Sequence, residues 1–149
     1  MIINTPANPY RAKSILIVDD SDIMLDVLTK AFERSGLEVF IADNGLDGWD
    51  LFIHEHIDIV LTDIRMPGMD GIELAHRIRD ASPATIIALM TGGPTDQATD
   101  LLKDGFVDHL FIKPFELRSV CETLLAKTKR CVISECASIE DGNQLTPFP

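Results

Sequence analysis

The alternation of two apolar patterns along the chain constrains its fold most strongly. Short apolar runs of strand length recur, and each is followed by a segment whose apolar residues are spaced three or four apart, as on one face of a helix. The runs occupy residues 15–18, 37–42, 57–62, 85–91 and 110–112, and the helical segments lie around residues 24–31, 46–53, 72–78, 98–102 and 117–125. Parallel strands need crossover connections, so this alternation predicts an α/β fold with a doubly wound, five-stranded parallel sheet and helices on both faces. We expect residues 37–42 to form an edge strand, because Glu38 interrupts their apolar pattern.

The alternating pattern covers residues 14–130 and leaves a short segment at each end. The whole chain has 149 residues, which is close to the usual size of one domain. We therefore predict a single domain at 14–130, an N-terminal extension at 1–13 and a C-terminal tail at 131–149. No apolar stretch approaches the roughly 20 residues that a membrane-spanning helix needs, and we expect a cytoplasmic protein that does not contact membranes.

The charge balance bears on the class of partner. The chain has 24 Asp and Glu residues against 13 Lys and Arg residues, which gives a net charge of −11 at pH 7. Such a chain repels nucleic-acid phosphates instead of replacing their counterions. We therefore expect no direct binding of nucleic acid.

Polar residues end four of the predicted strands, where ligands of an open parallel sheet bind. Asp19 and Asp20 end the first strand, Asp63 the third and Thr91 the fourth, while Lys113 follows the fifth. Three carboxylates and one ammonium leave two negative charges uncompensated, and each like-charge pair at about 4 Å costs about 4 kcal/mol at an effective dielectric of 20. Oxygen ligands without His or Cys favour a hard cation, Mg²⁺ or Mn²⁺, and its open positions suit phosphoryl chemistry.

Four sequence segments together resemble the receiver domain of the two-component response regulator family, to which the chemotaxis regulators belong. The resemblance covers about residues 14–130. The segments that carry it are Ile15-Leu16-Ile17-Val18-Asp19-Asp20, the run from Leu61-Thr62-Asp63 through Met66-Pro67-Gly68 to Gly71, Met90-Thr91-Gly92 and Lys113-Pro114-Phe115. Each segment alone is a weak indication of the family, whereas the four segments in this order at successive strand ends are a specific one. The resemblance implies the flavodoxin-like strand order 2-1-3-4-5. It also implies that the chain accepts a phosphoryl group and is a signalling domain with at most self-phosphorylation from small donors and autodephosphorylation.

The resemblance also implies a role for each residue at the strand ends. Asp63 is the expected phosphoacceptor, and its ionised carboxylate attacks phosphorus. The expected ligands of Mg²⁺ are Asp19, Asp20, Asp63 and the backbone carbonyl of Arg65. Lys113 and the hydroxyl of Thr91 are expected to contact the phosphoryl oxygens, so that catalysis is mainly positioning and charge neutralisation. In this family the peptide bond of Lys113-Pro114 is cis.

The partners implied by the resemblance are proteins. The phosphoryl donor is expected to be a phosphohistidine on a sensor histidine kinase or a histidine phosphotransfer protein. A downstream protein target is expected to contact the face formed by the fourth helix, fifth strand and fifth helix. The resemblance leaves a homodimer open.

Two features depart from the family pattern. The family usually has an aromatic residue three positions before the lysine, and this chain has Leu110 there. His109 and Phe111 flank it, so the sequence leaves open which of the three takes part in a conformational switch. The loop after the fourth strand is also unusual, because two glycines and a proline follow Thr91.

Three other functions remain as alternatives. A receiver-like interaction module that is never phosphorylated would tolerate Leu110. A phosphatase of the haloacid dehalogenase type also uses an aspartate nucleophile with Mg²⁺, but it has a second acid where this chain has Arg65. A nucleotide-binding module needs a glycine-rich phosphate loop, and Asp19-Asp20-Ser21-Asp22 follows the first strand instead.

Overall fold

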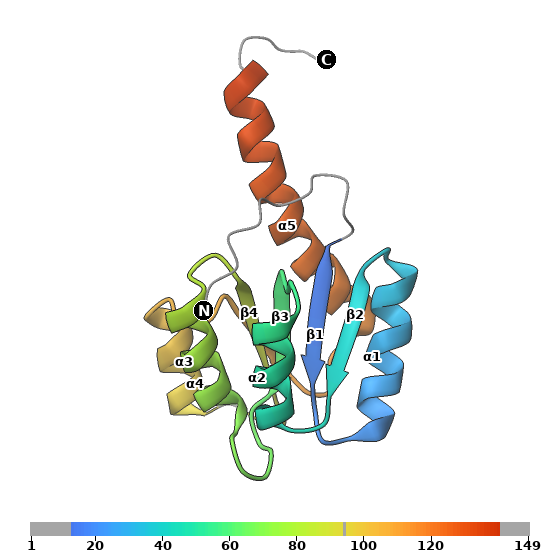
Figure 1. Ribbon diagram of the computed structural model, residues 1–149, viewed down its shortest axis with the longest axis vertical. Helices are drawn as coiled ribbons and strands as arrows, with labels where there is room; N and C mark the ends of the chain where they lie inside the picture. Colours follow the sequence, from blue (N-terminus) through green and yellow to red (C-terminus); the bar gives the residue numbers. More distant parts are fainter. Residues whose placement is uncertain (1–12, 94, 141–149) are drawn as a thin grey trace. The chain divides into compact units, whose positions relative to one another are not determined.

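The computed structural model describes residues 13–93 and 95–140, with side chains as far as Thr128 (Figure 1). Strands and helices alternate along the described chain, as the sequence predicts. The strands are β1 (Ser14–Val18), β2 (Glu38–Ala42), β3 (Ile59–Asp63), β4 (Ile86–Thr91) and β5 (His109–Ile112). The helices are α1 (Asp22–Arg34), α2 (Gly45–His54), α3 (Gly71–Ala81), α4 (Asp96–Lys103) and α5 (Leu117–Glu140). None of the helices in these ranges is long and apolar enough to cross a lipid bilayer.

The five strands form one parallel sheet in the order β2-β1-β3-β4-β5. The predicted fold class and strand order are therefore confirmed, and β2 lies at an edge as expected. The chain divides into two compact units at Pro114. The first unit holds the whole sheet with α1 to α4, and the second holds α5.

The central strands β1, β3 and β4 are buried on both faces of the sheet. Alternate strand residues, including Leu16, Val18 and Val60, belong to one apolar cluster with residues of α3 and α4. The intervening residues, such as Ile15 and Ile17, are equally buried and point to the opposite face. On that face α1 contacts β1 and β2 and buries Leu25, Leu28 and Phe32. Because β1, β3 and β4 are covered on both sides, their sequences are nearly unbroken apolar runs.

Helix α5 crosses the predicted domain boundary at residue 130. Helix α5 begins at Leu117 and continues without a break to Glu140, so the first part of the predicted tail is helical. The apolar spacing that located this helix weakens after Leu125, but a helix ends only where its backbone hydrogen bonds end, and no Gly or Pro interrupts residues 126–140. Residues 1–12 of the predicted extension and residues 141–149 of the tail lie outside the described residues.

At the amino ends of the strands, the guanidinium of Arg79 ties α3 to two connecting segments. Its Nη2 atom donates a hydrogen bond of 2.9 Å to Oδ2 of Asp108. The same oxygen also accepts a hydrogen bond of 2.9 Å from the backbone N–H of Ile87. The same guanidinium donates to three backbone carbonyl oxygens, those of Phe106, Pro83 and Thr85. The Arg79 side chain is 15% exposed, so these carbonyl groups would have few substitutes if it were removed.

We predict that Arg79→Met lowers the free energy of unfolding by about 2 kcal/mol, less than the loss of about 3–5 kcal/mol for a fully buried pair because Asp108 is partly exposed. Arg77→Met is the matched control. It removes an exposed pair with Glu73 on the same helix and should change the free energy by less than about 0.5 kcal/mol. Urea denaturation measures both values. Equal effects of the two substitutions would contradict this account.

Candidate functional site

The carboxyl ends of β1 and β3 bring three carboxylates together. These strands are neighbours in the sheet, and Asp63 is the last residue of β3 while Asp19 and Asp20 directly follow β1. One carboxylate oxygen from each of the three residues lies within 4.8 Å of the others. The strand ends thus create the acidic cluster that the sequence predicts.

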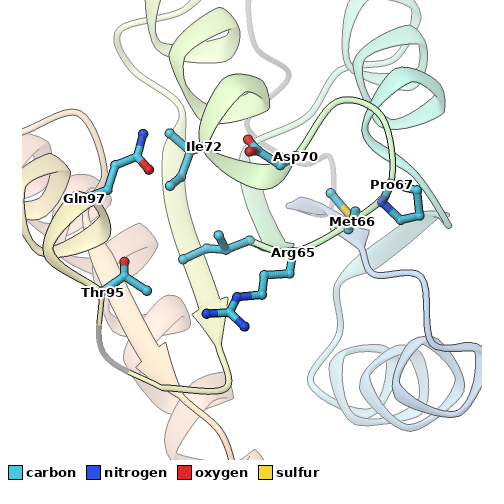
Figure 2. Close-up of a pocket in the computed structure, with 8 residues that line it drawn as sticks. Arg65, Met66, Pro67, Asp70, Ile72, Thr95 and Gln97 are labelled. Carbon is cyan, nitrogen blue, oxygen red and sulfur yellow. The ribbon is translucent and has the colours of Figure 1, made fainter.

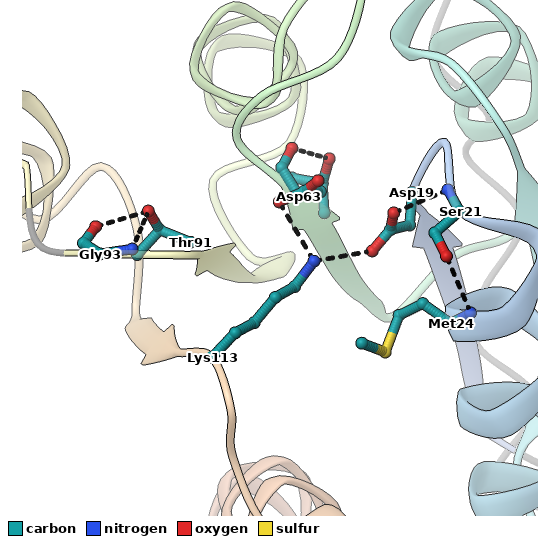
Figure 3. Close-up of polar contacts among 8 residues, drawn as sticks. Asp19, Ser21, Met24, Asp63, Thr91, Gly93 and Lys113 are labelled. Atoms are coloured by element: carbon teal, nitrogen blue, oxygen red, sulfur yellow. Dashed lines mark hydrogen bonds and ion pairs between the residues drawn. The ribbon is translucent and has the colours of Figure 1, made fainter.

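The ammonium of Lys113 reaches into this cluster from the end of β5. Its Nζ lies 3.2 Å from Oδ2 of Asp19 and 3.5 Å from Oδ1 of Asp63, so one cation bridges two carboxylates (Figure 3). The backbone N–H of Lys113 donates to the carbonyl oxygen of Thr91 at 2.7 Å, which fixes the start of the side chain against β4. The peptide bond of Lys113-Pro114 is cis, as expected.

Asp19 is held in place by the backbone around it. Its side chain accepts a hydrogen bond of 2.9 Å from the N–H of Ser21, and its own N–H donates to the carbonyl oxygen of Ala42 at 3.2 Å. Asp19 is 1% exposed, whereas the neighbouring Asp20 is exposed. The two adjacent acids therefore differ in environment: one is buried against Lys113, and the other is open to solvent.

Burial raises the pKa of the Asp63 carboxyl above its ordinary value, and the nearby Asp19 carboxylate raises it further. The ammonium of Lys113 opposes this shift by favouring the ionised form. Burial is the largest cause of the rise, and the Asp19 and Asp20 carboxylates act in the same direction. A further cation beside the cluster would favour ionised Asp63, which is the form that can act as a nucleophile.

The residues at this edge fit a divalent cation of the Mg²⁺ type. All three side chains offer carboxylate oxygens, the ligands that Mg²⁺ prefers, and the exposed Asp20 leaves the cluster open to water. Burial and the neighbouring Asp19 carboxylate raise the pKa of Asp63, and a cation beside the cluster would oppose this rise. Asp19, Asp20 and Asp63 are the residues that would hold the ion.

Thr91 ends β4 next to this cluster, but its hydroxyl faces the following loop. The hydroxyl donates to the carbonyl oxygen of Gly93 at 2.6 Å and accepts from the N–H of the same residue at 3.3 Å (Figure 3). The structure thus brings Asp19, Asp20, Asp63 and Lys113 together and leaves the Thr91 hydroxyl bound within the β4–α4 loop.

Arg65 lies in the loop that leaves Asp63, and its side chain is exposed. It lines a groove of about 540 Å³ between the β3–α3 loop and the start of α4 (Figure 2). Thr95 and Gln97 line the opposite side of this groove, and Ile72 is among its apolar residues. Among the described residues, the side chain that contacts the acids at this edge is that of Lys113, and the Arg65 guanidinium has no hydrogen bond or ion pair with them.

The three candidates for a switch residue lie on different faces of β5. Leu110 is opposite Leu89 and packs against the apolar cluster beneath α3 and α4. His109 and Phe111 are one position away on either side, so they point to the other face, where their rings stack 5.6 Å apart. Neither ring can occupy the place of Leu110 by a side-chain rotation alone.

Two backbone features of the site were not predicted from the sequence. The N–H of Ser21 anchors Asp19, and the side chain of Ser21 also caps the start of α1. A Cβ added at Gly71 would overlap the carbonyl oxygen of Asp63, so α3 starts in direct contact with the backbone of that aspartate. Sequence shows a glycine at this position but not the contact that requires it.

Comparison with known proteins identifies relatives over most of the described chain. A profile of the "Response regulator receiver domain" family matches residues 15–125. Sporulation initiation phosphotransferase F of Bacillus subtilis is 35% identical over 109 residues, covering 72% of this chain and 87% of that protein. Regulatory protein AtoC of Escherichia coli is 42% identical over 104 residues, covering 69% of this chain but only 22% of its own length.

A solved structure agrees with this comparison. The CheY-like response regulator receiver domain protein from Methanospirillum hungatei JF-1 superposes with a TM-score of 0.77 at 28% identity, covering 80% of this chain and 96% of that one. The sheet and its covering helices are therefore of the same kind as in that protein.

The raised pKa of Asp63 gives a prediction for the metal-free protein. The folded state keeps the Asp63 proton to a higher pH than the unfolded chain does, so the associated stability is present below the ordinary pKa of Asp, about 3.9, and is lost as pH rises through the folded pKa. Asp63→Asn replaces the titrating carboxyl with an amide, so this loss of stability at higher pH no longer occurs. We expect it to raise the free energy of unfolding at pH 7 by more than about 0.5 kcal/mol, measured by urea denaturation with a chelator present.

Lys113→Met serves as the opposite control, because it leaves the buried Asp19 carboxylate without its cation. It should lower the free energy of unfolding at pH 7. A loss of stability in Asp63→Asn would contradict the assignment of unbalanced charge to this cluster.

Proposed function

Because the chain belongs to the response regulator receiver domain family, we propose that it accepts a phosphoryl group on Asp63 and passes the signal on by protein contact. This family consists of two-component signalling domains and not of classical enzymes. The observation that carries the proposal is the position of the Lys113 ammonium between Asp19 and Asp63, beside a third carboxylate at the open edge of the sheet.

The donor that we propose is a phosphohistidine on a sensor histidine kinase or a histidine phosphotransfer protein. A carboxylate oxygen of Asp63 attacks phosphorus and forms a P–O bond, while the P–N bond to the donor imidazole breaks. The imidazole keeps the electron pair of that bond and takes up a proton. The product on this chain is an acyl phosphate, and Asp63 needs no general base because it attacks in its ionised form.

The other residues of the site position and neutralise charge. Lys113 is already 3.5 Å from Asp63, so its ammonium can follow the phosphoryl oxygens as they approach. The Thr91 hydroxyl can donate to a phosphoryl oxygen after it leaves Gly93. Bound Mg²⁺, held by Asp19, Asp20, Asp63 and the backbone carbonyl of Arg65, would neutralise negative charge that develops on those oxygens.

The acyl phosphate is removed when water attacks phosphorus and the P–O bond to Asp63 breaks, which regenerates the carboxylate. Gly92 and Gly93 have open space around their Cα atoms, so the loop beside Asp63 does not crowd this approach. We propose that this slow autodephosphorylation ends the signal.

The proposed output is contact with a downstream protein in the cytoplasm through α4, β5 and α5. Leu102 on α4 and Ile112 on β5 support this surface because both apolar side chains are exposed. A receiver-like module that is never phosphorylated remains the second candidate, since Leu110 packs into the apolar core where the family usually has an aromatic residue. Phosphorylation tests separate the two.

We predict that incubation with acetyl phosphate and Mg²⁺ adds about 80 Da, the mass of one phosphoryl group, to the intact protein. Asp63→Asn should gain no label, because an amide oxygen does not form a stable acyl phosphate. Intact-protein mass spectrometry reads both. An unlabelled wild-type chain would favour the second candidate, and a labelled Asp63→Asn chain would move the acceptor elsewhere.

We also predict that Asp20→Ala weakens Mg²⁺ binding by at least about tenfold, because it removes one of the carboxylates around the ion. Titration calorimetry measures the affinity. Asp26→Ala is the control, since it removes the same charge from an exposed position on α1 where Asp26 pairs with Lys30. Equal affinities in the two variants would remove Asp20 from the metal site.

A further inference from the structure

The first residue of α2 touches the loop that leaves the proposed phosphoacceptor. A Cβ added at Gly45 would overlap the carbonyl oxygen of Met69 and would lie 3.0 Å from both the carbonyl carbon and the Cβ of that residue. These atoms are backbone or close to it, so they cannot move away by a change of rotamer. The helix and the loop approach each other this closely only because position 45 has no side chain.

The backbone conformation of Gly45 does not require glycine. Among the described residues, positive φ angles occur at Gly36, Gly68 and Gly105 but not at Gly45. Alanine in a helix is favoured over glycine by about 0.5–1 kcal/mol, so the helix itself would be more stable with alanine at this position. The contact with Met69 is therefore what excludes a side chain.

The loop in question connects Asp63 to Gly71 and contains Arg65. At its far end the N–H of Gly71 donates to the carbonyl oxygen of Ile64 at 2.9 Å, and the Cα of Gly71 lies against the backbone of Asp63. Contacts between Gly71 and the backbone of Asp63 and Ile64 therefore hold this end of the loop. Gly45, the first residue of α2, contacts the same loop from outside, at Met69.

We propose that Gly45 is a positioning residue of the metal and phosphorylation site: the close approach of α2 to Met69 fixes the loop that carries Asp63 and the Arg65 carbonyl. This inference rests on the proposed function, since it names a residue that acts on the same site through the loop. The side chain of Asn44 accepts a hydrogen bond of 2.8 Å from the backbone N–H of Asp47 and so defines where α2 begins. This cap holds the first residue of α2, Gly45, against Met69.

The test compares Mg²⁺ affinity in Gly45→Ala with the wild-type chain by titration calorimetry. A new Cβ must displace Met69, and supporting contacts around metal ligands change affinity by about 10–100-fold when they are altered. We expect affinity at least about tenfold weaker and labelling by acetyl phosphate slowed to a similar extent. Arg79→Met is the control for general instability, because it weakens the fold at the opposite end of the strands and should leave Mg²⁺ affinity unchanged.

The outcomes separate this inference from the function on which it rests. If the wild-type chain neither binds Mg²⁺ nor accepts phosphate, the proposed function fails. If the wild-type chain does both and Gly45→Ala matches it, Gly45 is not a positioning residue. A loss of affinity in Arg79→Met equal to that in Gly45→Ala would also overturn the inference, because general instability would then explain both.

A measurement on the wild-type chain covers the case in which Gly45→Ala does not fold. The contact predicts a rigid β3–α3 loop even without Mg²⁺, with amide order parameters near 0.85, the value of rigid backbone. Values below about 0.6 in the metal-free protein would show that α2 does not fix the loop, and would contradict the proposal.

Discussion

The excess of negative charge at the carboxyl ends of β1 and β3 is the constraint on which the site depends. Three carboxylate oxygens lie within 4.8 Å of one another, and one ammonium contacts two of the three residues. Burial raises the pKa of Asp63, and the Asp19 and Asp20 carboxylates add to this rise. A folded chain keeps such a cluster only when the rest of the fold holds it together, and here the apolar sheet beneath it does so. The unbalanced charge then favours binding of a cation and reaction with a phosphoryl group.

Much of this arrangement could be predicted from sequence because it follows from strand periodicity. Nearly unbroken apolar runs fixed where β1, β3 and β4 lie, and parallel strands place their carboxyl ends at one edge. Asp19, Asp63 and Lys113 could therefore be assigned to a common edge although the lysine is 94 residues from Asp19 in the chain. The strand order agrees with the order that the family resemblance implies.

The remaining features depend on contacts that a linear pattern does not contain. The Thr91 hydroxyl bonds to Gly93 because the loop after β4 turns back on it, and sequence does not give that turn. Helix α5 continues to Glu140 although its apolar spacing weakens earlier. The sequence does not distinguish Gly45 and Gly71 from glycines that only relieve backbone strain. In the structure, each leaves room for a carbonyl group, that of Met69 for Gly45 and that of Asp63 for Gly71.

The central claim is that Asp63 carries the phosphoryl group beside a divalent ion held by its acidic neighbours. A crystal structure of the chain grown with Mg²⁺ and beryllium fluoride tests it most directly, because the fluoride adduct imitates an acyl phosphate. The account predicts beryllium bonded to a carboxylate oxygen of Asp63, Mg²⁺ at about 2.0–2.1 Å from oxygens of Asp20 and Asp63, and the Lys113 ammonium against a fluorine. Density for the adduct on another residue, or carboxylates spread apart with no ion between them, would contradict it.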